Sequence, residues 1–113
     1  MTSRAAATSG APMNLQQQLS QQTLQRLQIL LIEDDRIEAA LVRDQLAASP
    51  LANATVDHVQ RVGAGIERLR VRRYDLVLLD LNLPDGNGID NLHRVKAAAP
   101  TTPVIILTNV EDE

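Results

Sequence analysis

The sequence predicts an α/β domain with a parallel sheet covered by helices on both faces. From residue 28 onward, short apolar runs alternate with stretches of helical periodicity, a pattern typical of parallel strands joined by crossover helices. Two of the apolar runs also end in acids, the first in Glu33-Asp34-Asp35 and the third in Asp80. Because parallel strands place their carboxyl ends at one edge of the sheet, these acids are expected to converge there.

Composition narrows the class of protein. A chain of 113 residues, 44% hydrophobic and 22% charged, fits one soluble globular domain. No apolar run approaches the roughly 18 residues that cross a bilayer, and no secretory signal is visible, so we expect a cytoplasmic protein without a membrane segment. A net charge of -3 and a single aromatic residue argue against direct nucleic-acid binding. The absence of cysteine excludes disulfides and thiolate metal sites.

Residues 1–27 differ from the rest of the chain. Small residues with Gly and Pro are followed by the glutamine-rich run NLQQQLSQQTLQRLQ. This composition predicts a low-complexity, disordered tail, with a short partner-binding helix as the alternative. Met13 is an alternative to Met1 as the start of translation. Residues 28–113 are expected to form the domain.

The first strand is expected at 29–32 and leads into a helix. Asp34 or Asp35 caps the start of this helix, which closes near Ser49-Pro50. Its apolar residues form two neighbouring stripes, Ile37 with Leu41 and Val42 with Leu46. A weaker second strand follows at 54–59.

Two further helices and two further strands complete the pattern. The second helix carries Val62, Ile66 and Leu69 at helical spacing, although two glycines weaken its first turn. The third strand is expected at 76–80. The third helix carries Ile89, Leu92 and Val95 and ends before Pro100. The fourth strand, at 104–107, runs into Thr108 and Asn109.

The converging acids predict a cation site. Two carboxylates about 4 Å apart repel by roughly 4 kcal/mol at an effective dielectric constant of about 20, and a divalent cation removes that penalty. Oxygen donors without Cys or His favour Mg²⁺ over softer metals. With its charge neutralised, Asp80 is suited to attack an electrophilic phosphorus, because aspartyl phosphates are established covalent intermediates.

Three segments together resemble the receiver domain of two-component response regulators. They are LLIEDD at 30–35, DLVLLDLNLPDGNG at 75–88 and PVIILTN at 103–109. The similarity covers residues 28–113. It implies a flavodoxin-like, doubly wound parallel sheet with strand order 2-1-3-4-5.

The resemblance also implies roles for individual residues. Asp80 is similar to the phosphoacceptor, which takes a phosphoryl group from a sensor histidine kinase or a phosphotransfer protein. Asp34 resembles the direct Mg²⁺ ligand and Glu33 the acid that holds the ion through water, while Asn82 would offer its backbone carbonyl. Such a domain is not an enzyme beyond its own phosphorylation and dephosphorylation.

The remaining implied roles lie at the fourth strand and in the loop after Asp80. Thr108 resembles the switch hydroxyl, and the backbone N–H of Asn109 would contact the phosphoryl group. Pro84, Gly86 and Gly88 resemble the residues that shape the loop.

The sequence departs from this family at its carboxyl end. A fourth helix, a lysine-bearing fifth strand and a fifth helix are absent, and Lys96 is no substitute because it lies in the third helix. We therefore expect the fourth strand and the first helix to be left uncovered, and the chain to be a fragment of a longer regulator or to oligomerise through the fourth strand.

Two alternatives remain open. The first is a degenerate receiver that acts only as a protein-interaction or dimerisation module. The second is a phosphohydrolase, but that chemistry calls for a second acid two residues after the nucleophile, where Asn82 stands.

Overall fold

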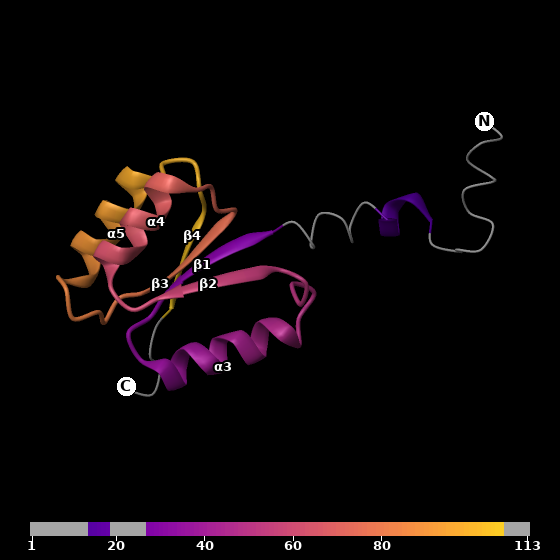
Figure 1. The fold of residues 1–113 in the computed structure, drawn as a ribbon, viewed down its shortest axis with the longest axis horizontal. Helices are drawn as coiled ribbons and strands as arrows, with labels where there is room; N and C mark the ends of the chain where they lie inside the picture. The colour runs from indigo at the N-terminus through magenta and orange to yellow at the C-terminus, as the bar shows by residue number, and fades with distance from the viewer. Residues whose placement is uncertain (1–13, 19–26, 108–113) are drawn as a thin grey trace.

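The computed structural model describes residues 14–18 and 27–107 and has a four-stranded parallel sheet at its centre (Figure 1). The strands are β1 (Gln28–Ile32), β2 (Thr55–Val59), β3 (Leu76–Asp80) and β4 (Val104–Leu107). Their order in the sheet is β2-β1-β3-β4, with every neighbouring pair parallel. The predicted fold class and the order of its first four strands are therefore confirmed.

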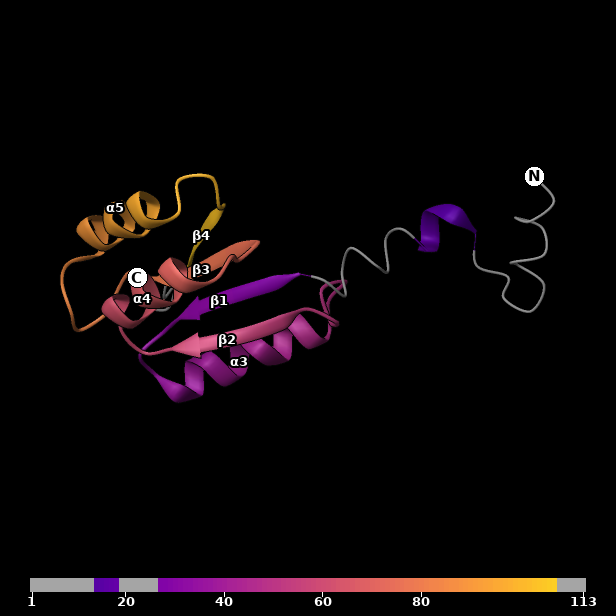
Figure 2. The ribbon, with the colours of Figure 1, turned by 45° about the horizontal axis from the view of Figure 1, so that its top comes forward.

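Three helices connect the strands and cover the two faces of the sheet. They are α3 (Arg36–Ala47), α4 (Val62–Val71) and α5 (Gly88–Ala98). In Figures 1 and 2, α3 lies on one face while α4 and α5 lie together on the other. Within the described part of the chain, no helix is long and apolar enough to cross a membrane.

Strand β1 is buried on both faces because its apolar residues are continuous. Ile29 and Leu31 pack with α3 in one core cluster, whereas Leu30 and Ile32 pack with α4 and α5 in the other. All four side chains are fully buried. A run without polar residues is what a strand at the centre of a parallel sheet requires.

The structure shows that Asp35, and not Asp34, caps the N-terminus of α3. The carboxylate of Asp35 accepts hydrogen bonds from the backbone N–H groups of Ile37 and Glu38, at 2.8 and 3.3 Å. Asp34 is thereby left out of the helix and available to the strand-end cluster. The helix ends at Ala47, slightly before the predicted end, where the Ser49 hydroxyl donates to the carbonyl of Leu46.

Only one of the two apolar stripes of α3 is covered. Val42 and Leu46 pack against the core, but Ile37 is 73% exposed and Leu41 is 51% exposed. On β4, Ile105 is 50% exposed. We call Ile37, Leu41 and Ile105 the apolar face; it agrees with the expectation that the first helix and fourth strand are left uncovered.

The loop between β3 and α5 depends on two glycines. Gly86 has φ +109°, a backbone conformation that side-chain-bearing residues rarely adopt. A Cβ atom at Gly86 would lie 2.8 Å from Oδ1 of the buried Asn91, and one at Gly88 would lie 2.9 Å from the carbonyl oxygen of Leu81. These contacts agree with the shape-setting role that the sequence assigned to this loop.

The same loop supplies the cap of α4. Arg61 precedes this helix and makes no side-chain cap bond. Instead, the Asp85 carboxylate accepts hydrogen bonds from the N–H groups of Val62 and Gly63, both at 3.0 Å. Burial alone would raise the pKa of Asp85, but the N–H groups of Gly63 and Val62 hold it below its ordinary value. The loop and α4 are therefore tied together.

A short helical turn at 15–18 lies in the predicted tail. The side chain of Asn14 accepts from the Gln17 N–H at 2.8 Å, and the Gln17 side chain accepts from the Asn14 N–H at 3.1 Å, which is the reciprocal pattern of a capping box. The rest of the predicted tail, 1–13 and 19–26, lies outside the described residues.

Replacing Asp85 by Ala should lower the free energy of unfolding by about 1–2 kcal/mol, because two N–H groups at the start of α4 lose their partner. Urea denaturation followed by circular dichroism measures this. The control is Asp44→Ala, which removes an exposed acid of α3 and should change stability by less than about 0.5 kcal/mol. Equal effects of the two substitutions would contradict the capping role.

Candidate functional site

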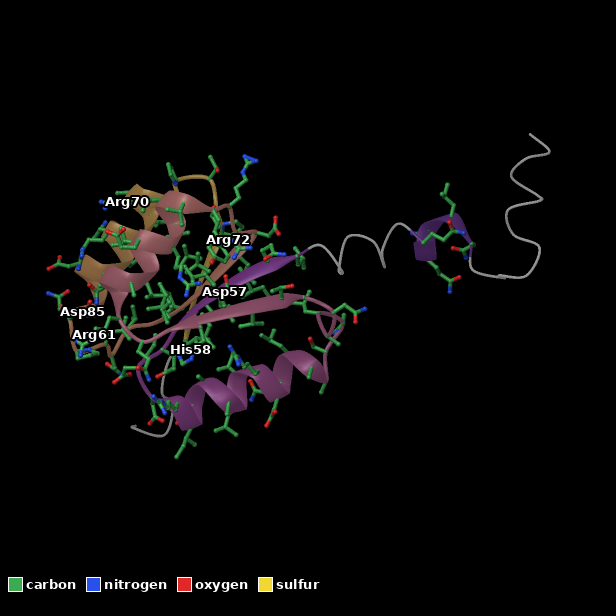
Figure 3. All side chains as sticks on the ribbon, in the orientation of Figure 1. Asp57, His58, Arg61, Arg70, Arg72 and Asp85 are labelled. Atoms are coloured by element: carbon green, nitrogen blue, oxygen red, sulfur yellow. The ribbon has the colours of Figure 1, made fainter. Side chains whose placement is uncertain are left out.

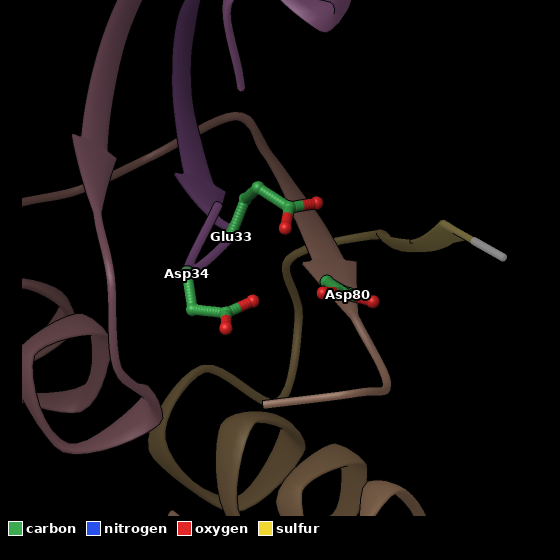
Figure 4. A group of neighbouring side chains, drawn as sticks. All are labelled: Glu33, Asp34 and Asp80. Carbon is green, nitrogen blue, oxygen red and sulfur yellow. The ribbon is translucent and has the colours of Figure 1, made fainter. Parts of the chain in front are cut away.

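Three carboxylates meet at the carboxyl edge of the sheet (Figure 4). Glu33 and Asp34 follow β1 directly, and Asp80 is the last residue of β3. The two strands are neighbours, so their ends lie side by side. One carboxylate oxygen from each residue lies within 4.8 Å of the others. The convergence predicted from the strand ends is therefore observed.

Hydrogen bonds fix the two buried acids. Glu33 is 6% exposed, and its carboxylate accepts from the N–H of Asp35 at 3.2 Å. Asp80 is 8% exposed, and its Oδ1 accepts from the N–H of Asn82 at 3.0 Å. Asp34 is exposed. The site therefore combines two oriented acids with one that faces solvent.

The acids lie in a cleft of about 440 Å³ between α3 and the ends of β3 and β4. Its acidic wall comprises Glu33, Asp34, Asp35, Glu38 and Asp80, and its other lining residues are Leu41, Val42, Gln45, Asn82, Ile106 and Leu107. Among residues 14–18 and 27–107, no basic residue lines the cleft. The charge of the cluster is thus uncompensated by the described residues that surround it.

The pKa of Glu33 is raised from 4.5 to about 7. Burial is the largest cause, and the neighbouring Asp80 and Asp34 carboxylates add to it, while the hydrogen bond from the Asp35 backbone opposes it. A cation placed among the three acids would remove this repulsion. Because all donors are oxygen atoms, the site fits a hard divalent ion such as Mg²⁺.

The other predicted site residues are placed as follows. Asn82 lines the cleft next to Asp80. Leu107, the last residue of β4, also lines it. Thr108 and Asn109 lie outside the described residues.

Two residues that support the site were not found by sequence reasoning. His58 on β2 donates from Nε2 to the backbone carbonyl of Glu33 at 2.7 Å, and Asp85 caps α4. Both bonds join residues more than twenty positions apart, so no local pattern marks them. The sequence held one indirect sign of the Asp85 cap: Arg61, the residue just before α4, is a poor capping residue.

Glu33 should make the metal-free protein less stable as the pH rises. Between pH 4.5 and about 7 the native state keeps a proton on Glu33 that the unfolded chain releases, so the free energy of unfolding falls with increasing pH. In EDTA, Glu33→Gln should therefore exceed the parent chain in stability by roughly 1–3 kcal/mol at about pH 8, and match it below about pH 4. Urea melts across this range measure the difference.

The matched control is Glu67→Gln, since the Glu67 side chain is 71% exposed; it should show no such pH dependence. Mg²⁺ should stabilise the parent chain more than the Glu33→Gln variant. Parallel pH curves for the parent and Glu33→Gln would contradict the assignment.

The sequence matches known regulators. The family model of the response regulator receiver domain matches residues 29–113. The cell cycle transcriptional regulator CtrA of Caulobacter vibrioides is 38% identical over 82 residues, which cover 73% of this chain and 34% of that protein. The regulatory protein LuxO of Vibrio vulnificus is 44% identical over 81 residues, which cover 69% of this chain and 17% of that protein. This chain thus spans about a third or less of the length of these relatives.

Solved structures agree with the sequence matches. The phosphorylated cyanobacterial phytochrome response regulator RcpA has a TM-score of 0.65 and 31% identity, covering 77% of this chain and 69% of that one. The response regulator MaeR bound to beryllium trifluoride has a TM-score of 0.65 and 32% identity, covering 74% and 68%. Together with the order β2-β1-β3-β4 and the acids at its edge, these matches establish that the chain belongs to the response regulator receiver domain family.

Proposed function

We propose that the chain is the receiver module of a two-component phosphorelay, in which Asp80 accepts a phosphoryl group. The observation that carries the proposal is the approach of the Glu33, Asp34 and Asp80 carboxylates to within 4.8 Å at the strand ends. The proposed donor is a phosphohistidine of a sensor histidine kinase or phosphotransfer protein in the cytoplasm. Family membership supports this choice.

The proposed metal is Mg²⁺. Asp34 and Asp80 would bind it directly, Glu33 through water and Asn82 through its backbone carbonyl. When bound, the ion neutralises the acids and the charge of the incoming phosphoryl group. The oxygen-only donor set and the raised pKa of Glu33 support this assignment.

Asp80 is the proposed nucleophile. The N–H of Asn82 donates to its Oδ1 at 3.0 Å, and the carboxylates of Glu33 and Asp34 lie next to it. Attack forms an oxygen–phosphorus bond as the phosphorus–nitrogen bond to the donor imidazole breaks, and the leaving imidazole keeps the electron pair and takes a proton from water. The Thr108 hydroxyl and the Asn109 N–H are proposed to contact the transferred group. The chain would catalyse only its own phosphorylation and dephosphorylation.

Incubation with acetyl phosphate and Mg²⁺ should add one phosphoryl group, detected by intact-protein mass spectrometry. Asp80→Asn should abolish the gain, because an amide does not attack phosphorus. Asp44→Asn, an equal charge change on an exposed part of α3, should leave it intact. EDTA should suppress labelling of the parent chain. Labelling that persists in Asp80→Asn would place the phosphoryl group elsewhere.

The apolar face favours a second candidate function, a protein-interaction or dimerisation module. Ile37, Leu41 and Ile105 are each at least half exposed, and large exposed apolar side chains are common at contact sites. Ile105 lies on β4, whose open edge adds unpaired backbone groups within the described part of the sheet. In this role Asp80 would be dispensable.

If this second role holds, sedimentation velocity should show concentration-dependent association of the chain. Ile105→Lys or Leu41→Lys should shift it toward monomer, because a charge on the apolar face opposes burial. Val71→Lys on α4, where Val71 is 75% exposed, is the matched control and should have no effect. Asp80→Asn should also leave association unchanged. A monomer at all concentrations would rule the dimerisation role out.

A further inference from the structure

A second hollow, of about 580 Å³, lies beside the open edge of β2. Its walls come from α3, from the end of β2 and from the start of α4. The polar residues that line it are Arg36, Arg43, His58, Gln60 and Arg61, and none of the described residues that line it is acidic. We call this hollow the basic groove.

The groove and the acidic cleft lie along opposite flanks of the same helix. Arg36 and Arg43 are seven positions apart and lie on one flank of α3, while Glu38 and Gln45 lie about half a turn round, on the other flank. Basic side chains therefore line one hollow and acidic side chains line the other, in a chain whose net charge is -3. The floor of the groove is small and apolar, because three alanines and Val59 line it.

The arginines of the groove are available for a partner. Among the described residues, the ion pairs involve Arg68, Arg70 and Arg72, which lie outside the groove. Figure 3 shows Arg61 and Arg70 at opposite ends of α4. Within the described part of the chain, neither the Arg36 nor the Arg61 side chain makes an ion pair or a hydrogen bond. The Arg43 guanidinium donates one hydrogen bond, to the backbone carbonyl of Val56, at 3.4 Å.

The backbone of β2 offers hydrogen bonds along the same groove. The Thr55 N–H donates to the carbonyl of Leu27, and the Val59 carbonyl accepts from the N–H of Glu33. Both groups therefore point toward β1. Since backbone groups alternate along a strand, those of Val56 and His58 point away from β1. The His58 ring is already fixed by its bond to the Glu33 carbonyl, so this part of the edge is ordered before any ligand arrives.

We propose that the basic groove binds an extended acidic peptide of a partner protein, which adds as a strand along the open edge of β2. Main-chain bonds to His58 would align the peptide, small side chains would lie over the alanine floor, and its carboxylates would face Arg36, Arg43 and Arg61. A nucleic acid fits less well, because no Phe, Tyr or Trp side chain of the described residues lines the groove for stacking. A lone phosphate ion would occupy little of a hollow of 580 Å³.

The probe is an end-blocked fluorescent peptide of alternating Glu and Val, about ten residues long, measured by anisotropy against the full chain. We expect binding that weakens with salt. Arg61→Glu and Arg36→Glu should each raise the dissociation constant roughly fivefold or more. Arg70→Glu makes the same charge change outside the groove and should leave the affinity unchanged. A peptide of alternating Lys and Val should not bind.

Amide hydrogen exchange provides a readout that needs no substitution. The peptide should protect the His58 amide, whereas binding at the apolar face would leave that amide unaffected. Equal loss of affinity in Arg70→Glu, full competition by inorganic phosphate or by a single-stranded oligonucleotide, or absence of protection at His58 would overturn the proposal. Because no acid of the cleft is involved, Asp80→Asn should bind the peptide normally, which separates this test from that of phosphorylation.

Discussion

The parallel pairing of β1 with β3 is the constraint on which the site depends. Ile32 is in register with Leu79, so the residues that follow emerge together at the edge of the sheet. A slip of one residue would turn the apolar side chains of a strand toward the wrong face, and both faces of β1 are buried. The burial that makes the sheet stable therefore also fixes the separation of Glu33 and Asp80.

This pairing forces an electrostatic cost onto the fold. Two acids with less than a tenth of their surface exposed face a third, and the only compensation visible in the described residues is a few backbone N–H groups. The cost falls on Glu33, whose pKa is raised to about 7 by burial and by the neighbouring carboxylates. Sites that bind cations commonly hold such uncompensated negative charge, because the bound cation neutralises it.

The strands and helices could be predicted from the sequence because their signals are local. The apolar run at 76–80 and the helical spacing after Gly88 each lie within one element, and both elements were predicted close to their observed bounds. The choice between Asp34 and Asp35 as cap was left open, since both satisfy the same local rule. Which stripe of α3 is covered depends on packing, so the exposure of Ile37 was not readable from periodicity. The bonds of His58 and Asp85 join distant segments, so no local sequence pattern identifies either partner.

The hydrogen bonds between Asp85 and α4 limit how far the loop after β3 can move without moving this helix. Asn82 and Asp85 are three positions apart, so the segment between them spans at most roughly 10 Å even when fully extended. One end borders the acidic cleft and the other is fastened to the first turn of α4 by two hydrogen bonds. Such a short segment allows little independent movement of its two ends. A displacement at Asn82 is therefore passed on as strain in those two bonds or as movement of α4, which couples this helix to events in the cleft although the cleft is lined by α3.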